Sequence, residues 1–107
     1  MGLAVWLAEA AERDIDDIYR YIAERDGTAN ADRVLRRIEQ VCSSLATFPW
    51  RGNVPKELRA LGITKYREAH FKPYRIVYCV VEPGVIIYSV IDGRRDIQSH
   101  LLRRLVL

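Results

Sequence analysis

The 107-residue sequence predicts an α+β fold: an N-terminal strand and an antiparallel two-helix hairpin, then a three-stranded antiparallel meander and a short C-terminal helix. Two observations predict this order. Apolar residues recur with a period near 3.6 in the first half of the chain, and from Thr64 onward the period changes to two. Because the helices precede the strands instead of alternating with them, we expect them to cover one face of the sheet. The length is that of a single domain, residues 1–107.

The first half of the chain is expected to form a strand followed by two helices. LAVWL (residues 3–7) predicts the strand, and RDGT (residues 25–28) separates the helices, with Gly27 ending the first and Thr28 capping the second. The apolar stripe of the first helix consists of Ala8, Ala11, Ile15, Ile18, Tyr19 and Ile22, with Asp14, Asp16, Asp17 and Arg20 on its other face. The second stripe consists of Ala31, Val34, Leu35, Ile38, Val41, Cys42, Leu45 and Phe48, and Pro49 ends that helix.

The second half is expected to form the meander and a closing helix. Residues 49–62 predict a loop with one helical turn. TKYREAHF (64–71), YRIVYCVV (74–81) and VIIYSVI (85–91) predict three strands, the last two joined by the tight turn EPG. Ile97, Leu101, Leu102 and Leu105 predict the C-terminal helix, which Asp96 is placed to cap.

Composition excludes several classes of protein. No apolar run is long enough to span a bilayer, and the N-terminus lacks the basic region of a signal peptide. Cys42 and Cys79 fall in apolar contexts without metal or redox spacing, as expected for core thiols of a cytoplasmic protein. We therefore expect no metal, no cofactor and no membrane association.

The net charge of +3 conceals an asymmetry between the two halves. Residues 1–50 hold six arginines and nine acids, a balance of −3, whereas residues 51–107 hold eleven Lys or Arg and five acids, a balance of +6. A basic half in a small domain is typical of proteins that bind a polyanion or an acidic partner, although a solvated surface gives the same composition.

The arginines of the second half are candidates for an anion-binding patch. Arg75 interrupts an otherwise apolar strand, and we expect it on the sheet face that the two helices leave open. If the strands are neighbours, four arginines could converge there with two lysines at the rim: Arg67, Arg75, Arg94, Arg95, Lys65 and Lys72. The alternative is that Arg75 pairs with an acid such as Glu68 or Asp92 and that the others are solvated.

Acid–base candidates are sparse. His70 and His100 are the two histidines, and Glu57 and Glu68 are further candidates. His100 lies four residues beyond Asp96, so the two could form a local ion pair on one helix face. No nucleophile elbow, phosphate-cradling glycine loop or metal constellation is present in the sequence.

Four segments in this order resemble the RelE/ParE superfamily of bacterial type II toxin–antitoxin toxins: AERDIDDIYRYIA, LATFPWRGNVPKELRALG, YREAHFKPYRIVYCVV and VIDGRRDIQSHLLRRL. The resemblance implies a small α+β toxin with a helical hairpin on a twisted antiparallel sheet. It also implies a cognate antitoxin from the same operon, which neutralises the toxin and through which the complex binds operator DNA.

The superfamily divides by target, and the resemblance implies different residues for each. RelE-like members are ribosome-dependent mRNA endoribonucleases, for which Arg75 and Arg95 match the family arginines and Arg67 stands for a strand lysine. Glu57 and His100 match acid–base positions of a related variant. However, Ala69 and Leu101 occupy positions where the family has a lysine and a tyrosine, so the proton-transfer set is incomplete.

ParE-like members inhibit DNA gyrase by binding and need no catalytic residues. The tail DGRRDIQSHLLRRL resembles their C-terminal pattern, so a gyrase poison is slightly favoured over the ribonuclease. Residues expected to contact the target or the antitoxin are Arg67, Arg75, Arg94, Arg95, Leu101, Arg103 and Arg104. A third alternative is a non-toxic remnant that binds only the antitoxin.

Overall fold

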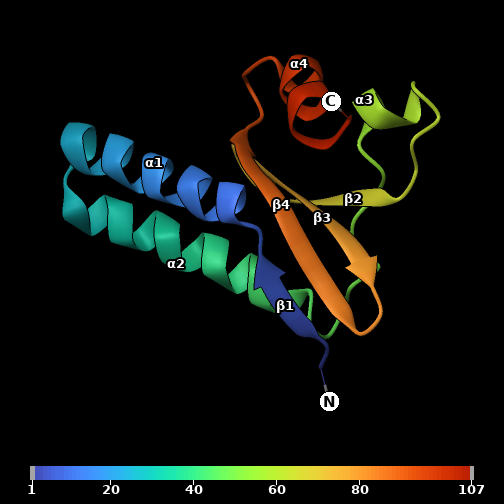
Figure 1. Ribbon diagram of the computed structural model, residues 1–107. Coiled ribbons are helices and arrows are strands. Elements are labelled where there is room, and N and C mark those ends of the chain that lie inside the picture. The colour runs from blue at the N-terminus through green and yellow to red at the C-terminus, as the bar shows by residue number, and fades with distance from the viewer. Residues whose placement is uncertain (1, 107) are drawn as a thin grey trace.

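In the computed structural model, which describes residues 2–106, a four-stranded sheet lies beside a hairpin of two long helices (Figure 1). The strands are β1 (Ala4–Leu7), β2 (Tyr66–Phe71), β3 (Tyr74–Val81) and β4 (Gly84–Asp92). The helices are α1 (Glu9–Asp26), α2 (Thr28–Ser44), α3 (Lys56–Arg59) and α4 (Ile97–Leu101), which a π-helical turn (Leu102–Val106) continues. The predicted α+β fold and its element order are confirmed. No helix among these is long and apolar enough to cross a bilayer.

The sheet is mixed, with strand order β1-β4-β3-β2. The meander β2-β3-β4 is antiparallel, as predicted, and β1 joins it in parallel beside β4. Gly84 permits this contact, because a Cβ atom there would collide with the Ala4 carbonyl and lie 2.8 Å from the Trp6 ring. β1 and β2 are therefore the two edges of the sheet.

The hairpin packs its apolar stripes against one face of the sheet. Ile15 and Ile22 of α1 and Val34 and Ile38 of α2 are buried, and β3 and β4 contribute Ile76, Tyr78, Val85, Ile87 and Val90 to this core. Burial of each large side chain stabilises the fold by about 1.5–3 kcal/mol, which is why two such helices stay in place. Gly27, with φ = 93°, joins the helices through a backbone conformation that favours glycine.

Two local predictions on the second helix are wrong. Gly27 takes the N-cap position, so Thr28 is the first helical residue and makes no cap hydrogen bond. The helix also ends at Ser44, before the stripe does, and Phe48 is 62% exposed. The last turn tightens there, because the N–H groups of Leu45, Ala46 and Thr47 bond to carbonyls three residues earlier instead of four.

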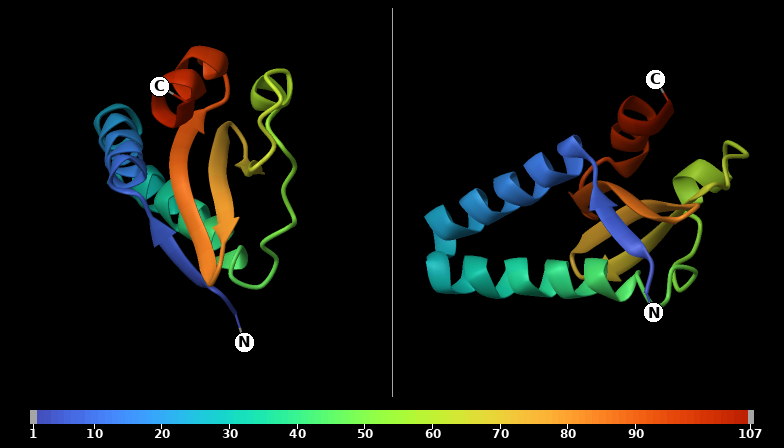
Figure 2. Two further views of the ribbon diagram at one scale, coloured as in Figure 1. Left: turned by 45° about the vertical axis from the view of Figure 1, so that its right-hand side comes forward. Right: turned by 60° about the horizontal axis from the view of Figure 1, so that its bottom comes forward.

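A second, smaller core covers the face that the hairpin leaves open. α3 and α4 lie on that side of the sheet (Figure 2). Its buried members are Leu58, Tyr66, Val77, Ile91, Ile97 and Leu101. As predicted, α4 is capped by Asp96, whose carboxylate accepts a hydrogen bond from the Ser99 N–H at 3.1 Å. The loop before β2 also contains the expected helical turn, α3.

Candidate functional site

Arg75 is held between two glutamates on the face of the second core. Side chains alternate along β3, so Arg75 and Val77 share this face while Ile76 joins the hairpin core. Its guanidinium donates to both carboxylate oxygens of Glu57, at 2.7 and 2.9 Å, and its Nε donates to Glu68 at 2.6 Å. The Arg75 side chain is only 13% exposed. The sequence alternative in which Arg75 pairs with Glu68 is therefore observed, with Glu57 as a second partner.

These contacts leave Arg75 little capacity to bind a phosphate. The hydrogen bond to Glu57, and to a smaller extent the one to Glu68, raises the pKa of Arg75 above its usual value. The bond from Arg75 in turn holds the pKa of Glu57 below its usual range. The one guanidinium faces two carboxyl groups, and His70 Nε2 lies 3.5 Å from that of Glu68. A phosphate would have to displace a carboxylate that already bonds to Arg75.

Arg67 lies on the other face of the sheet and supports a loop. Its Nη2 donates to the carbonyls of Trp50, at 3.1 Å, and Gly52, and its guanidinium lies 5.4 Å from the Trp50 ring centroid. Tyr78 holds the same loop, since its hydroxyl donates to the Pro49 carbonyl at 2.8 Å. Trp50 itself is 65% exposed. Arg67 therefore positions an exposed aromatic side chain.

The predicted convergence of four arginines on one patch is consequently wrong. Arg67 pairs with Tyr78 and shares its face on the hairpin core, whereas Arg75 lies on the opposite face with Val77. Lys65, expected at the rim, lies 5.2 Å over the Tyr66 ring. Arg94 and Arg95 follow β4 just beyond Gly93, which packs against the Arg75 side chain, but Arg94 pairs with Asp92.

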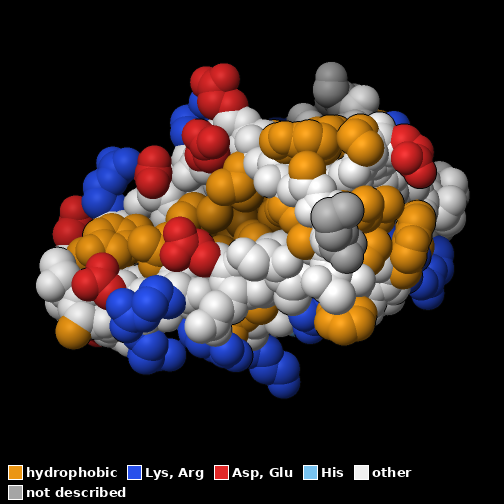
Figure 3. Space-filling model, turned by 90° about the horizontal axis from the view of Figure 1, so that it is seen from below, with side chains coloured by type: hydrophobic (Ala, Val, Ile, Leu, Met, Phe, Trp, Pro, Cys, Tyr) orange, Lys and Arg blue, Asp and Glu red, His pale blue; other side chains and the backbone are white. Residues whose placement is uncertain are grey.

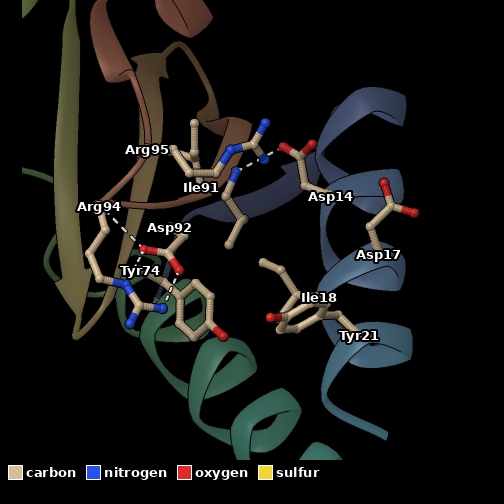
Figure 4. A pocket seen from close by; sticks show the side chains of 10 residues that line it. Asp14, Asp17, Ile18, Tyr21, Tyr74, Ile91, Asp92, Arg94 and Arg95 are labelled. Carbon is tan, nitrogen blue, oxygen red and sulfur yellow. Dashed lines mark hydrogen bonds and ion pairs between the residues drawn. The ribbon is translucent and has the colours of Figure 1, made fainter. Parts of the chain in front are cut away.

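Arg94 and Arg95 stand at the mouth of a cleft of about 440 Å³ between α1 and the end of β4 (Figure 4). Arg94 turns back on Asp92, with Nη2 at 2.5 Å from the carboxylate, and stays 77% exposed. Arg95 is exposed and makes no ion pair within residues 2–106. The cleft is lined by Asp14, Asp17, Ile18, Tyr21, Tyr74, Val90, Ile91, Asp92, Arg94 and Arg95.

Asp14 connects this cleft to the C-terminal tail, which we define as residues 96–106. Its carboxylate accepts two hydrogen bonds from Arg104, at 2.9 and 3.1 Å, and one from the Val90 N–H at 2.9 Å. Arg104 also donates to the Tyr88 carbonyl at 2.9 Å. The Asp14–Arg104 pair therefore satisfies the Val90 N–H and the Tyr88 carbonyl, which lie at the part of the β4 edge that β1 is too short to cover.

A β-bulge creates that arrangement. Val77 pairs with Ser89 and Tyr78 with Ile87, so Tyr88 has no partner on β3 and the alternation of β4 shifts by one residue. Sequence periodicity gave no sign of the bulge, and it placed Asp14 on the exposed face of its helix. Asp14 is the principal residue that the sequence analysis missed. Asp14 lies in the second turn of α1, seven residues after β1 ends, and no sequence pattern distinguishes it from Asp16 and Asp17.

His100 packs against β4 instead of pairing with Asp96. Its Nε2 lies 2.7 Å from the hydroxyl of Ser89, which is fully buried. Burial, followed by the positive charge of Arg104, lowers the pKa of His100. The neutral form is thus favoured, and a Ser89 hydroxyl without solvent access is a structural partner, not a nucleophile.

The remaining predicted site residues belong to the tail. Arg103 is exposed, whereas Leu101 is fully buried in the second core and is able to contact a target only if the tail leaves the sheet. Arg94, Arg95 and Arg103 are exposed cations at this end of the molecule, and the charges of Arg95 and Arg103 both act on His100. We refer to these three arginines as the cationic end.

Two solved structures of toxin–antitoxin systems contain chains with a similar fold. This chain is similar to the structure titled "Chromosomal ParDE TA system from P. aeruginosa", with a TM-score of 0.68 and 17% identity over 84% of this chain and 95% of that one. It is also similar to the toxin–antitoxin complex RelBE2 from Mycobacterium tuberculosis, with a TM-score of 0.62 and 18% identity over 86% and 99% of the chains. At these identities the two comparisons show a shared fold.

Sequence comparison identifies the family to which the chain belongs. Residues 5–97 match the family described as the ParE toxin of the type II toxin–antitoxin system parDE. Toxin ParE3 of Caulobacter vibrioides is 32% identical over 88 residues, which cover 82% of this chain and 84% of that protein. The chain therefore belongs to the ParE toxin family of type II toxin–antitoxin systems.

Proposed function

We propose that this ParE-family toxin inhibits growth by binding DNA gyrase and not by cleaving RNA. The observation that carries the proposal is the engagement of Arg75 by Glu57 and Glu68. A ribonuclease of the RelE type needs a free cation where charge develops on the phosphate, and here two carboxylates already occupy that cation. A poison that acts by binding has no such requirement.

The other ribonuclease candidates support the same proposal. Glu57 is held as an ion-pair partner, and His100 is hydrogen-bonded to a buried serine on β4. Arg67 is committed to loop carbonyls on the opposite face from Arg75. A general base must reach the proton that it abstracts, and these groups do not share one open site.

The cationic end is the surface that we assign to the target. Arg94, Arg95 and Arg103 are exposed beside a cleft, on a segment that Asp14 and Arg104 hold in place. Arginine is enriched among the residues that dominate binding energy at protein interfaces, and a pre-ordered segment loses little entropy on binding. Gyrase bound to DNA offers both protein and phosphate to such a surface.

A cognate antitoxin is the second partner in this proposal. Both structural neighbours come from toxin–antitoxin systems, and the cationic end suits acidic side chains of a neutralising protein. Gyrase and antitoxin are both cytoplasmic, which places the action of the chain in the cytoplasm.

Charge reversal tests the target surface. Arg95→Glu combined with Arg103→Glu should abolish growth inhibition on expression without antitoxin, and the purified variant should no longer inhibit gyrase supercoiling. Arg20→Glu, on the exposed side of α1, is the matched control and should remain toxic. Full toxicity of the double variant, at equal expression, would contradict the assigned surface.

A further inference from the structure

One face of α2 carries arginines that have no acidic partner. Arg33 and Arg37 are four residues apart, and the same face continues to Ser44, seven residues further on. Arg51 joins it from the following loop by donating to the Ser44 hydroxyl at 2.7 Å. We call Arg33, Arg37 and Arg51 the α2 stripe. In the space-filling view, a group of Lys and Arg side chains lines the lower margin of the molecule, away from the hydrophobic hollow (Figure 3).

The arginines of the α2 stripe are oriented but not neutralised. Arg33 donates to the side-chain oxygen of Asn30 at 2.8 and 3.1 Å, and Arg37 donates to that of Gln40 at 2.8 Å. Like the serine that holds the third arginine, these partners are uncharged. All three guanidinium groups are exposed, and none forms an ion pair with another residue of the described chain. Ordered side chains that keep their full charge favour an anionic ligand.

The acidic residues of α2 are engaged elsewhere. Asp32 accepts a hydrogen bond from the Tyr19 hydroxyl of α1 at 2.8 Å, and Glu39 borders the hollow between the two long helices. Both carboxylates therefore lie off the face that carries the α2 stripe. This arrangement gathers uncompensated positive charge on α2, although the first half of the chain has a negative balance overall.

Two exposed aromatic side chains lie at the end of the α2 stripe. Phe48 is 62% exposed and Trp50 is 65% exposed, and they line a surface hollow of about 530 Å³ beside Arg51. Their loop is fixed from behind, because Arg67 and Tyr78 donate to its carbonyls and the Arg67 guanidinium lies 5.4 Å from the Trp50 ring centroid. The loop therefore presents aromatic rings next to free cations in a defined geometry.

We propose that the α2 stripe and the Trp50 loop bind a strand of DNA whose bases are unpaired. The inference deepens the proposed function and rests on it, because gyrase supplies the DNA that the toxin meets. The arginines of the stripe bind phosphates through their forked N–H groups, and Trp50 and Phe48 stack on bases. From Arg33 to Ser44 the face is about 16 Å long, which corresponds to about five phosphates of one strand in duplex geometry.

An unpaired strand uses both features of this surface. An acidic peptide would pair with the arginines and would leave the exposed rings without a matching group. A duplex would offer phosphates, but its bases are stacked on one another and present no free face to Trp50. Every unpaired base has such a face, so stacking requires no particular sequence. The surface is built from α2 and the loop after it, whereas the cationic end follows β4, so one chain has separate surfaces for protein and for DNA.

The salt dependence of binding tests the phosphate contacts. The probe is a fluorescent strand of about 20 deoxythymidines, and anisotropy measures its affinity for the purified chain at several salt concentrations. Arg33→Gln combined with Arg37→Gln should reduce the slope of log affinity against log salt by about 1.4, since each lost phosphate contact removes about 0.7. Arg13→Gln combined with Arg20→Gln removes the same charge from the exposed side of α1 and should leave the slope unchanged. Equal slopes in both double variants would overturn the inference.

Replacement of Trp50 tests the stacking of bases. Trp50→Ala should weaken binding of the deoxythymidine strand at least fivefold, whereas Trp50→Phe keeps an aromatic ring and should bind within about threefold of the original chain. An abasic strand of the same length should bind the original chain and Trp50→Ala equally. Equal losses on the two strands would show that Trp50 acts through the structure of its loop and would contradict stacking.

These measurements need no gyrase, so the two proposals fail separately. A folded chain that inhibits gyrase but does not bind the deoxythymidine strand would overturn this inference and leave the proposed function intact. A chain that binds the strand and leaves gyrase unaffected would contradict the proposed function, while the DNA-binding surface would stand. Tighter binding to a uridine strand of the same length would overturn the assignment to DNA. Loss of antitoxin binding in the Arg33 and Arg37 double variant, with unchanged binding of the strand, would assign the surface to a protein partner and overturn the inference as well.

Discussion

At the scale of single residues, the most informative contact is the one that Arg75 makes with Glu57 and Glu68. An arginine in an apolar strand signals either a site or a buried ion pair, and sequence reasoning left both readings open. The structure decides between them through α3, which brings Glu57 within 2.7 Å of the guanidinium. Glu57 lies on a short helical turn eighteen residues before Arg75, and the spacing of residues along the sequence does not predict a contact between them.

Replacing Arg75 tests whether it stabilises the fold. Arg75→Met leaves two nearly buried carboxylates without a counter-charge, so we expect the free energy of unfolding to fall by about 3–5 kcal/mol. Chemical denaturation measures the change. The combination Arg75→Met with Glu57→Gln and Glu68→Gln should recover part of the loss, because no unpaired charge remains. A stable Arg75→Met variant would contradict this structural role.

His100 predicts a pH dependence of stability. Its pKa is lowered in the folded chain by burial and by Arg104, Arg95 and Arg103, with Asp14 acting in the opposite direction. Its contribution to stability is therefore fully present above the unfolded pKa of 6.5, and it is lost as the pH falls through the lower folded pKa.

Denaturation at pH 7.5 and pH 5.5 measures this effect. The unfolding free energy should decrease over this interval, and His100→Gln should make the decrease smaller. Gln98→Ala, at an exposed position of the same helix, is the matched control and should leave the pH dependence of the original chain in place. An unchanged slope in His100→Gln would rule out this assignment.

At the scale of elements, the tail and β1 share the outer side of β4. β1 covers its first half, and the Asp14–Arg104 pair satisfies Tyr88 and Val90 in its second half. The tail is thus fixed by a partly buried ion pair as well as by the second core. This attachment keeps the cationic end ordered.

Arg104→Met should release the tail without unfolding the sheet. It removes the partner of Asp14, and we expect a loss of about 2–3 kcal/mol together with faster amide exchange in residues 97–106. Arg103→Met, at an exposed neighbouring position, should leave exchange of the tail unchanged. Equal protection of the tail in both variants would show that the second core alone holds it.

At the scale of the whole molecule, periodicity was enough to predict the elements and the antiparallel meander, because each stripe faces one core. It could not predict the parallel position of β1 beside β4, since that pairing joins the two ends of the chain. The candidate site was harder still to predict from the sequence. The bulge at Tyr88 and the inward turn of Asp14 arise from tertiary packing, and they decide which cations remain free.

We propose that the chain inhibits growth by binding gyrase through the cationic end and not by cleaving RNA. The most direct measurement is the trapping of covalent gyrase–DNA cleavage complexes by the purified chain, with topoisomerase IV as a control and ribosome-dependent mRNA cleavage in parallel. We expect cleavage complexes to accumulate at near-stoichiometric toxin, and we expect Arg95→Glu with Arg103→Glu to abolish them. Ribosome-bound mRNA should stay intact. Cleavage of ribosome-bound mRNA by a folded chain that leaves gyrase unaffected would contradict it.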